Sequence, residues 1–220
     1  MDFVLGTKIL EEVDSPINGR IRVVRSLAFG TYIQVDNLTQ SGGVVEEIWR
    51  KTLKKIHNSK FIIHNSLILG LGGGTAAKIV RKLWPASRGE PDAKITGVEI
   101  DPIMIGLGKK YLGLGNIDVD IKIQDAYEFV TQVSNVKTQK YDLILMDLYV
   151  GYGVPEKFTT DFFLRFILKL LSGGGIAVFN RLYFDRKRVE AVKFGNKLKK
   201  VFGEVEIFYP EANVMFICKN

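Results

Sequence analysis

The sequence predicts an α/β fold with a mostly parallel sheet, preceded by a small β-hairpin region. From residue 66 onward, short apolar runs alternate with amphipathic stretches of helical period, which is typical of helices packed on a parallel sheet. Gly70, Gly72 and Gly74 directly follow the first of these runs. A glycine turn between a strand and a helix is the layout of a nucleotide-binding half-sheet.

Residues 1–43 form the predicted hairpin region. Strand-like residues 7–13 and 20–25 flank Asn18-Gly19, a strong hairpin signal, and residues 31–35 offer a third strand. So small a sheet is too short to fold alone. The segment 40–43, QSGG, breaks the strand pattern, and residues 44–56 read as a helix with acids early and lysines late, as the helix dipole favours. We therefore divide the chain into a subdomain, 1–43, and a main domain, 44–220.

The main domain opens with a strand at 66–69, a helix at 75–84 and a strand at 93–100 that contains Glu99. The glycines are spaced G-x-G-x-G, whereas a dinucleotide fingerprint is G-x-G-x-x-G with an acid about 20 residues on. The compact spacing fits an adenosine-sulfonium site better than a pyrophosphate site. The alternative is that the glycines only make a tight turn.

Later elements continue the alternation. Residue Pro102 stands where a helix begins, and the helix continues over 103–112. Further helices are predicted at 126–133, 160–171 and 186–202, and further strands at 119–125, 141–147, 176–180, 204–209 and 214–218. Residues 148–158 form an irregular loop, and the glycines at 173–175 turn into the next strand. The last two strands, separated by only four residues, should form an antiparallel hairpin at the sheet edge.

Four acids follow or end the apolar strands: Glu99, Asp101, Asp125 and Asp147. Ligands of open α/β sheets lie beyond the carboxyl ends of the strands, so these acids are candidate ligand contacts. For Asp101 and Asp125, capping of the next helix is an equally good interpretation. Asp147 precedes a loop rather than a helix, so capping does not explain it.

Composition limits the remaining function classes. A chain of 220 residues with 46% hydrophobic content and a net charge of +7 indicates one globular domain with, at most, a small appendage. A single cysteine, Cys218, excludes an internal disulfide and a cysteine-based zinc site, and two histidines leave little for a metal cluster. No apolar run approaches the roughly 18 residues of a membrane span, and the N-terminus lacks a signal-peptide pattern. We expect a cytoplasmic protein with no metal and no membrane contact.

Basic residues gather at 50–60 and at 186–200. On helices these would mostly be solvated faces; attraction of an acidic partner is the other interpretation. Nucleic-acid binding stays open but is not indicated, because no basic and aromatic interleaving occurs.

Several motifs together resemble the class I S-adenosylmethionine-dependent methyltransferases. They are the glycine turn, VEID at 98–101, QDA at 124–126, YDLILMD at 141–147 and LSGGGIAVFN at 171–180. The N-terminal hairpins ending in Gln40, the run KKYL at 109–112 and PEKFTTDFF at 155–163 are similar, more narrowly, to the spermidine synthase-like branch, the polyamine aminopropyltransferases. The resemblance covers nearly the whole chain and implies a Rossmann-like sheet and an S-adenosylmethionine or decarboxylated S-adenosylmethionine ligand.

The resemblance also implies roles for individual residues. Glu99 would hold the ribose hydroxyls, Asp125 with Ala126 would lie beside adenine, and Asp147 would orient the attacking amine. The cofactor-binding candidates are Gln40, Gly70, Gly72, Gly74, Glu99, Asp101, Asp125 and Ala126.

Three positions depart from the aminopropyltransferase pattern. Gly73 stands where that family has an aspartate that binds the donor's ammonium group, and Val150 stands where a second loop acid holds the polyamine. Val45 stands where that family has a tyrosine, on the helix that follows the N-terminal sheet. Because a bound polyamine needs carboxylate partners, these departures disfavour aminopropyl transfer to putrescine.

We therefore rank methyl transfer to an unknown acceptor, a small molecule or a protein, as the leading hypothesis. Asp147 would face the acceptor, with Tyr149, Tyr152 and Asn180 as rim contacts; loop packing and strand termination are the respective alternatives. The first alternative is a polyamine aminopropyltransferase in which Glu46, Glu47 or Asp161 replaces the lost acids. The second is a non-catalytic protein that binds an adenosyl ligand. A homodimer is left open.

Overall fold

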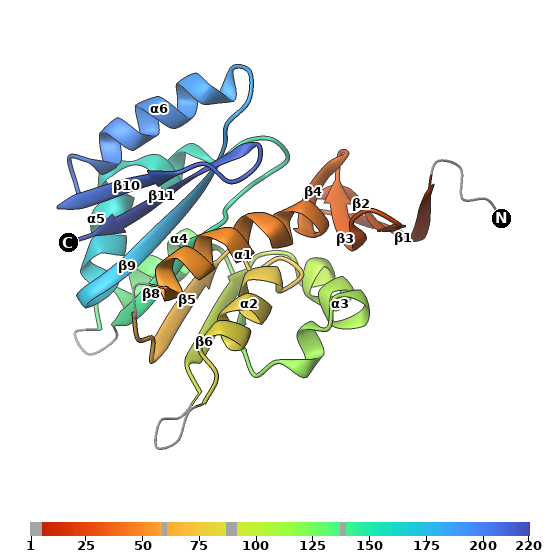
Figure 1. The fold of residues 1–220 in the computed structure, drawn as a ribbon, viewed down its shortest axis with the longest axis horizontal. Coiled ribbons are helices and arrows are strands. Elements are labelled where there is room, and N and C mark those ends of the chain that lie inside the picture. Colours follow the sequence, from red (N-terminus) through yellow and green to blue (C-terminus); the bar gives the residue numbers. More distant parts are fainter. Residues whose placement is uncertain (1–5, 59–60, 87–91, 137–139) are drawn as a thin grey trace.

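A computed structural model describes residues 6–58, 61–86, 92–136 and 140–220. Its main body is a seven-stranded sheet with the strand order β10-β11-β9-β8-β5-β6-β7 (Figure 1). The five strands β7, β6, β5, β8 and β9 pair in parallel, and β11 and β10 add an antiparallel hairpin at one edge. The predicted fold class and the edge hairpin are confirmed. The strand bounds are β5 Asn65–Leu69, β6 Lys94–Glu99, β7 Asp120–Ile123, β8 Tyr141–Met146, β9 Leu171–Leu182, β10 Glu204–Phe208 and β11 Asn213–Lys219.

Helices cover both faces of this sheet (Figure 1). One face packs against α1 (Gly43–His57) and α2 (Thr75–Leu83), whose Trp49 and Ala77 are fully buried. The other face packs against α4 (Ala126–Val133), α5 (Asp161–Leu170) and α6 (Lys187–Leu198), with Phe163 at the centre of that core. Burial of apolar side chains on both sides explains why the central strands are continuous apolar runs.

The N-terminal region is a separate antiparallel sheet of four strands in the order β1-β2-β3-β4. Its strands are β1 Thr7–Ser15, β2 Gly19–Ser26, β3 Gly30–Val35 and β4 Leu38–Gly42. This sheet packs through Ile33 onto α3 (Pro102–Tyr111), which contributes Met104 and Leu107 to the contact. The division into two structural domains stays a prediction.

Two local predictions are wrong. The segment QSGG was expected to break the strand pattern, but residues 38–42 form β4, because the backbone of β3 supplies hydrogen-bond partners that need no apolar side chains. The glycines 173–175 were expected to make a turn, but they lie inside β9, which begins at Leu171. The register of β9 against β8 shifts in this stretch, between Tyr141 and Leu143.

The remaining elements agree with the prediction to within a few residues at most boundaries. The helix α6 ends at Leu198 rather than at 202, and α5 begins after Thr160, whose hydroxyl accepts a hydrogen bond from the Phe163 N–H. The predicted irregular loop contains a short 3-10 helix, η3 (Glu156–Thr159), and a second one, η2 (Leu114–Asn116), follows α3. The connection at 85–92, between the predicted helix 75–84 and the predicted strand 93–100, lies mostly outside the described residues.

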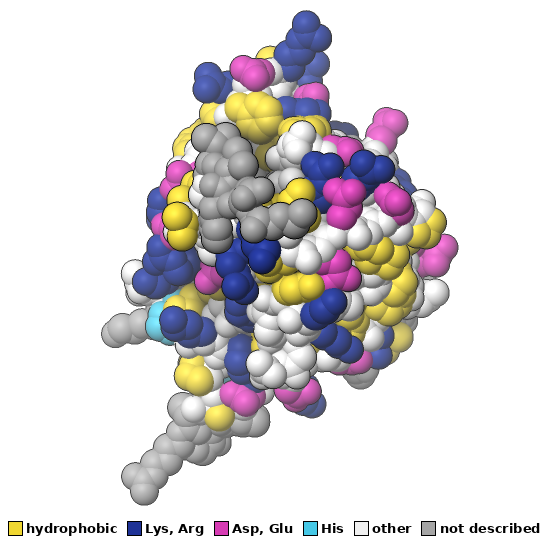
Figure 2. Space-filling view, turned by 90° about the vertical axis from the view of Figure 1, so that its right-hand side faces the viewer, with side chains coloured by type: hydrophobic (Ala, Val, Ile, Leu, Met, Phe, Trp, Pro, Cys, Tyr) yellow, Lys and Arg dark blue, Asp and Glu magenta, His cyan; other side chains and the backbone are white. Residues whose placement is uncertain are grey.

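The surface carries interspersed charges. Figure 2 shows basic and acidic side chains mixed over the end that bears the four-stranded sheet, where Arg22 pairs with Glu12 and Lys110 with Glu11. On α1, Lys51 pairs with Glu211 and Lys55 with Glu206. These pairs support the interpretation of the basic stretch at 50–60 as a solvated helix face. No helix among the described residues is long and apolar enough to cross a membrane.

Candidate functional site

The glycine turn between β5 and α2 is pressed against the end of β8. Gly70 has a φ of 84°, and a Cβ at this position would lie 2.2 Å from the Asp147 carbonyl oxygen. Only glycine tolerates both the positive φ and this close approach. A Cβ at Gly72 would lie 2.7 Å from the Ser41 hydroxyl of β4, so the N-terminal sheet covers the turn from the other side.

Glu99, at the end of β6, lies across from this turn and is buried. One carboxylate oxygen accepts a hydrogen bond from the Gly72 N–H at 2.8 Å; the other accepts from the N–H groups of Ile100 and Asp101. Burial raises the pKa of Glu99 above its ordinary value, and the three backbone donors oppose that rise. Each carboxylate oxygen has two lone pairs, so Glu99 retains acceptor capacity for a ligand.

A cavity of about 280 Å³ opens between the turn, the end of β6, the start of α4 and the loop after β8. Seven of the predicted cofactor or catalytic residues line it, together with the substrate candidate Tyr149. The seven are Gln40, Gly70, Gly72, Glu99, Asp125, Ala126 and Asp147. The fold therefore brings together in one cavity residues that lie up to 109 positions apart along the chain.

Asp125 lines this cavity and is held by three hydrogen-bond donors. Its carboxylate caps α4 by accepting hydrogen bonds from the N–H groups of Tyr127 and Glu128, which confirms the capping interpretation. Lys157, on η3, donates to its other oxygen at 2.6 Å. Burial acts to raise the pKa of Asp125, but the Lys157 ammonium and the backbone donors outweigh it and lower the pKa.

Asp147, directly after β8, is held from both sides. The Trp49 indole N–H donates to one carboxylate oxygen at 2.8 Å, and the Asn180 amide donates to the other at 2.8 Å. Burial raises the pKa of Asp147, while these two donors and the nearby Arg181 charge act to lower it. The carboxylate is thus fixed in position at the edge of the cavity.

A second cavity, of about 250 Å³, adjoins the first at Gln40, Asp147 and Tyr149. We call it the acceptor cavity, because the sequence predicts that Asp147 faces an acceptor. Its polar lining consists mostly of neutral groups, including the amides of Asn37, Gln40, Asn180 and Asn213. Asp147 is the one carboxylate among its lining residues in the described part of the chain.

Three predicted site residues lie outside both cavities. Gly74 has a φ of 87° at the start of α2, where a Cβ would lie 2.5 Å from Leu114. The buried Asp101 carboxylate accepts hydrogen bonds from Ser15 and Asn18 of the N-terminal hairpin and from the Ile103 N–H, so it caps α3. Tyr152 donates its hydroxyl to the Asp36 carbonyl oxygen. A ligand-binding role for each of the three stays a prediction.

The proposed replacement acids do not reach the acceptor cavity either. Glu46 and Asp161 are exposed, and Glu47 pairs with Arg50 on the same helix face. Among the described residues, no group of three or more His, Cys, Asp or Glu side chains could hold a metal ion.

Sequence reasoning missed Trp49, Lys157 and Ser41. Trp49 fits the apolar face of its helix, and only the packing of α1 against β8 reveals that its N–H reaches Asp147. Ser41 accepts a hydrogen bond from the Gly73 N–H at 2.7 Å, through a strand that the prediction lacked. For Lys157 the signal in the sequence is its place in the motif PEKFTTDFF, whose resemblance implied no role for the lysine.

Comparison with known proteins agrees with this architecture. A model of the spermine/spermidine synthase domain matches residues 47–212. The polyamine aminopropyltransferase of Clostridioides difficile is 30% identical over 210 residues, which cover 90% of this chain and 71% of that protein. A mouse eEF1A lysine and N-terminal methyltransferase is 26% identical over 160 residues, which cover 70% of this chain. The chain spans only 22% of that mouse protein, and 36% of a Vibrio vulnificus polyamine aminopropyltransferase that it also matches.

Two solved structures share the fold. A spermidine synthase in complex with the transition-state analogue AdoDATO superposes with a TM-score of 0.73 at 19% identity, over 96% of this chain and 72% of that one. Human methyltransferase-like protein 13 in complex with SAH superposes with a TM-score of 0.62 at 21% identity, over 80% and 81% of the two chains. Because the family model covers most of the chain, this protein belongs to the spermine/spermidine synthase domain family.

Proposed function

We propose that this protein is a transferase that binds an S-adenosyl sulfonium donor in the cavity beneath the glycine turn, which we call the donor cavity, and alkylates an amine held next to Asp147. The observation that carries the proposal is the junction of the two cavities at Asp147, with Glu99 and the glycine turn in the first and neutral amides in the second. A donor and an acceptor placed on either side of this junction could meet in line, as alkyl transfer requires.

The first cavity suits a nucleoside. Its apolar lining includes Val98, Ile100 and Phe158, which supply surface for a base and a ribose. Glu99 supplies a buried acceptor for ribose hydroxyls, and Asp125 could accept from an exocyclic amine at the far side. The solved relatives with AdoDATO and SAH support a ligand of this class.

The reaction requires the protein mainly to position the donor and the acceptor and to exclude water from the site. The neutral amine nitrogen forms a bond to the carbon attached to sulfur, the carbon–sulfur bond breaks, and the sulfur becomes a neutral thioether. The proton lost by the amine passes to Asp147 or to water. A buried carboxylate whose pKa is raised by its surroundings is a fitting acceptor for that proton.

Aminopropyl transfer to a polyamine has the wider support from relatives, which reverses the order expected from sequence alone. The family model covers residues 47–212, and the Clostridioides relative that aligns over 90% of this chain is a polyamine aminopropyltransferase. We rank it first for that reason.

Methyl transfer is the second candidate, and one observation favours it. A polyamine carries several ammonium groups, and each needs a carboxylate partner when it is buried. The acceptor cavity offers Asp147 alone among the described residues. The mouse relative is named as a methyltransferase, which also supports this candidate.

Calorimetric titration with S-adenosylmethionine, its decarboxylated form and methylthioadenosine tests the proposal. Preference for the decarboxylated donor, with turnover of putrescine, supports aminopropyl transfer. Preference for S-adenosylmethionine supports methyl transfer. Absence of binding by all three ligands would refute the proposal and favour a protein that retains the cleft for another purpose. Glu99→Gln serves as the matched variant, which should bind each ligand more weakly.

A further inference from the structure

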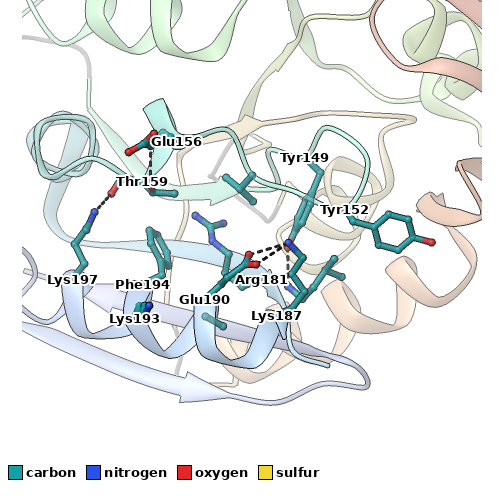
Figure 3. A pocket seen from close by; sticks show the side chains of 13 residues that line it. Tyr149, Tyr152, Glu156, Thr159, Arg181, Lys187, Glu190, Lys193, Phe194 and Lys197 are labelled. Atoms are coloured by element: carbon teal, nitrogen blue, oxygen red, sulfur yellow. Dashed lines mark hydrogen bonds and ion pairs between the residues drawn. The ribbon is translucent and has the colours of Figure 1, made fainter. Parts of the chain in front are cut away.

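We propose that a third cavity, which lies beside α6 and adjoins the donor and acceptor cavities at Tyr149, binds a small oxoanion, a carboxylate or a phosphate, through Arg181. Figure 3 shows this cavity, which has a volume of about 300 Å³ and lies between α6 and the segment that carries Glu156 and Thr159. The proposal does not depend on the transfer reaction proposed above.

Arg181 reaches this cavity because side chains alternate along β9. Phe179 packs in the core beneath α6, and Arg181, two residues further on, faces the same helix. The intervening Asn180 points to the opposite face of the sheet, where it holds Asp147. Adjacent residues of β9, Asn180 and Arg181, therefore line two different cavities.

The guanidinium of Arg181 is buried and incompletely paired. Arg181 is 7% exposed, and its Nη1 donates to the Asn180 carbonyl oxygen at 2.7 Å. Its Nη2 is buried and makes no hydrogen bond within the described residues, and no carboxylate there forms an ion pair with it. The guanidinium carbon lies 3.9 Å from the centroid of the Phe194 ring.

Such a group is costly to bury. An ionised side chain taken out of water without a counter-charge loses several kcal/mol, and stacking on an aromatic ring returns only part of that. Burial accordingly lowers the pKa of Arg181. The Asp147 carboxylate acts on Arg181 without forming an ion pair with it. An oxoanion in the cavity would supply the missing acceptor for Nη2 and a negative charge in direct contact, which makes a charge-assisted hydrogen bond of the stronger kind.

The rim of the cavity adds positive charge. Lys187, Lys193 and Lys197 line it, against the carboxylates of Glu156 and Glu190. Lys187 is neutralised by Glu190 at 2.9 Å, whereas Lys193 makes no ion pair among the described residues. The cavity is thus basic without being a broad basic surface, which favours a small anion over a nucleic-acid backbone.

Thermal unfolding of the full chain, titrated with sodium phosphate or sodium acetate against sodium chloride of equal ionic strength, tests the site. We expect at least one oxoanion to raise Tm saturably; phosphate alone indicates a phosphate ligand, and acetate alone a carboxylate. Arg181→Met should abolish the response, and Lys193→Ala should weaken binding about tenfold. Two control variants should retain the response to oxoanion. They are Lys200→Ala, at an exposed lysine just after the end of α6, and Glu99→Gln, in the donor cavity.

The proposal is overturned if neither oxoanion stabilises the protein beyond chloride, or if Arg181→Met responds like the unmodified chain. Circular dichroism establishes whether Arg181→Met is folded. If that variant does not fold, Lys193→Ala decides: a response equal to that of Lys200→Ala overturns the site, and a weakened one supports it.

Discussion

The indole N–H of Trp49 donates a hydrogen bond to Asp147 at 2.8 Å across 98 residues of sequence. The Asn180 amide binds the opposite oxygen, so the carboxylate has a fixed direction at the junction of the two cavities. Burial raises the pKa of Asp147, and each donor opposes that rise by stabilising the charged form. Trp49 and Asn180 are therefore positioning residues that favour the ionised form of Asp147.

Replacing Trp49 by Phe should shift the pH dependence of transfer. Loss of the indole donor removes one group that lowers the pKa of Asp147, so the pKa rises and the acidic limb of kcat/KM moves to higher pH. Asn180→Ala should shift it in the same direction. A purely structural role for Trp49 would lower activity equally at every pH, so a parallel loss would contradict the prediction.

Glu99→Gln should weaken binding of adenosyl ligands by about tenfold or more, because a charged acceptor is lost from a buried site. Calorimetry measures the change. Glu128→Gln, on the exposed face of α4, is the matched control and should bind as the unmodified chain does. Unchanged affinity in Glu99→Gln would remove Glu99 from the donor site.

The same variant should change how stability depends on pH. Burial raises the folded-state pKa of Glu99 above its ordinary 4.5. Between these two values the folded chain holds a proton that the unfolded chain has lost. The contribution of Glu99 to the free energy of unfolding is therefore fully present below pH 4.5 and is lost as pH rises through the folded pKa. Asp147 contributes with the same sign. Urea unfolding over this interval should show a shallower decline for Glu99→Gln, and an unchanged slope would contradict the assignment.

Two variants separate the two roles of Asp125, the capping of α4 and the predicted binding of an adenosyl ligand. Asp125→Ala removes the α4 cap and should cost about 1 kcal/mol of unfolding free energy. Asp125→Asn keeps a side-chain oxygen for the cap, so its stability should be nearly unchanged, yet it loses the carboxylate. Both variants should bind adenosyl ligands more weakly. If Asp125→Asn binds normally, capping and the Lys157 pair account for the residue entirely.

Gly73→Asp should not convert the site to the pattern of the aminopropyltransferases. A Cβ at Gly73 would lie 2.8 Å from Leu112 and 3.0 Å from Ile33, so the position points into the packing between α3 and the N-terminal sheet. We expect Gly73→Ala and Gly73→Asp each to lose about 1–3 kcal/mol of unfolding free energy through overpacking. Leu112→Ala should partly restore the Gly73→Ala variant. A stable Gly73→Asp variant with raised affinity for decarboxylated S-adenosylmethionine would contradict this prediction.

Local pattern was enough for the parts of the fold that depend on neighbours in sequence. Apolar runs, helical periods and the Asn18-Gly19 turn predicted nearly every element of the two sheets, because each depends on residues a few positions apart. The compact glycine turn and the strand-end acids predicted the donor cavity for a similar reason. Parallel strands bring their carboxyl ends to one edge, so Gly70, Glu99, Asp125 and Asp147 had to converge there.

Only the tertiary structure decided which partners these residues have. The strand β4 forms because β3 lies beside it, and its own side chains give no such signal. Asp101 proved to hold the N-terminal hairpin rather than to line a cavity, through Ser15 and Asn18 more than 80 positions away. The pairing of Trp49 with Asp147 and the incompletely paired Arg181 beneath α6 likewise depend on how whole helices pack on the sheet. Hydrogen bonds and charges act over a few ångströms in space, and sequence distance carries no information about them until the chain has folded.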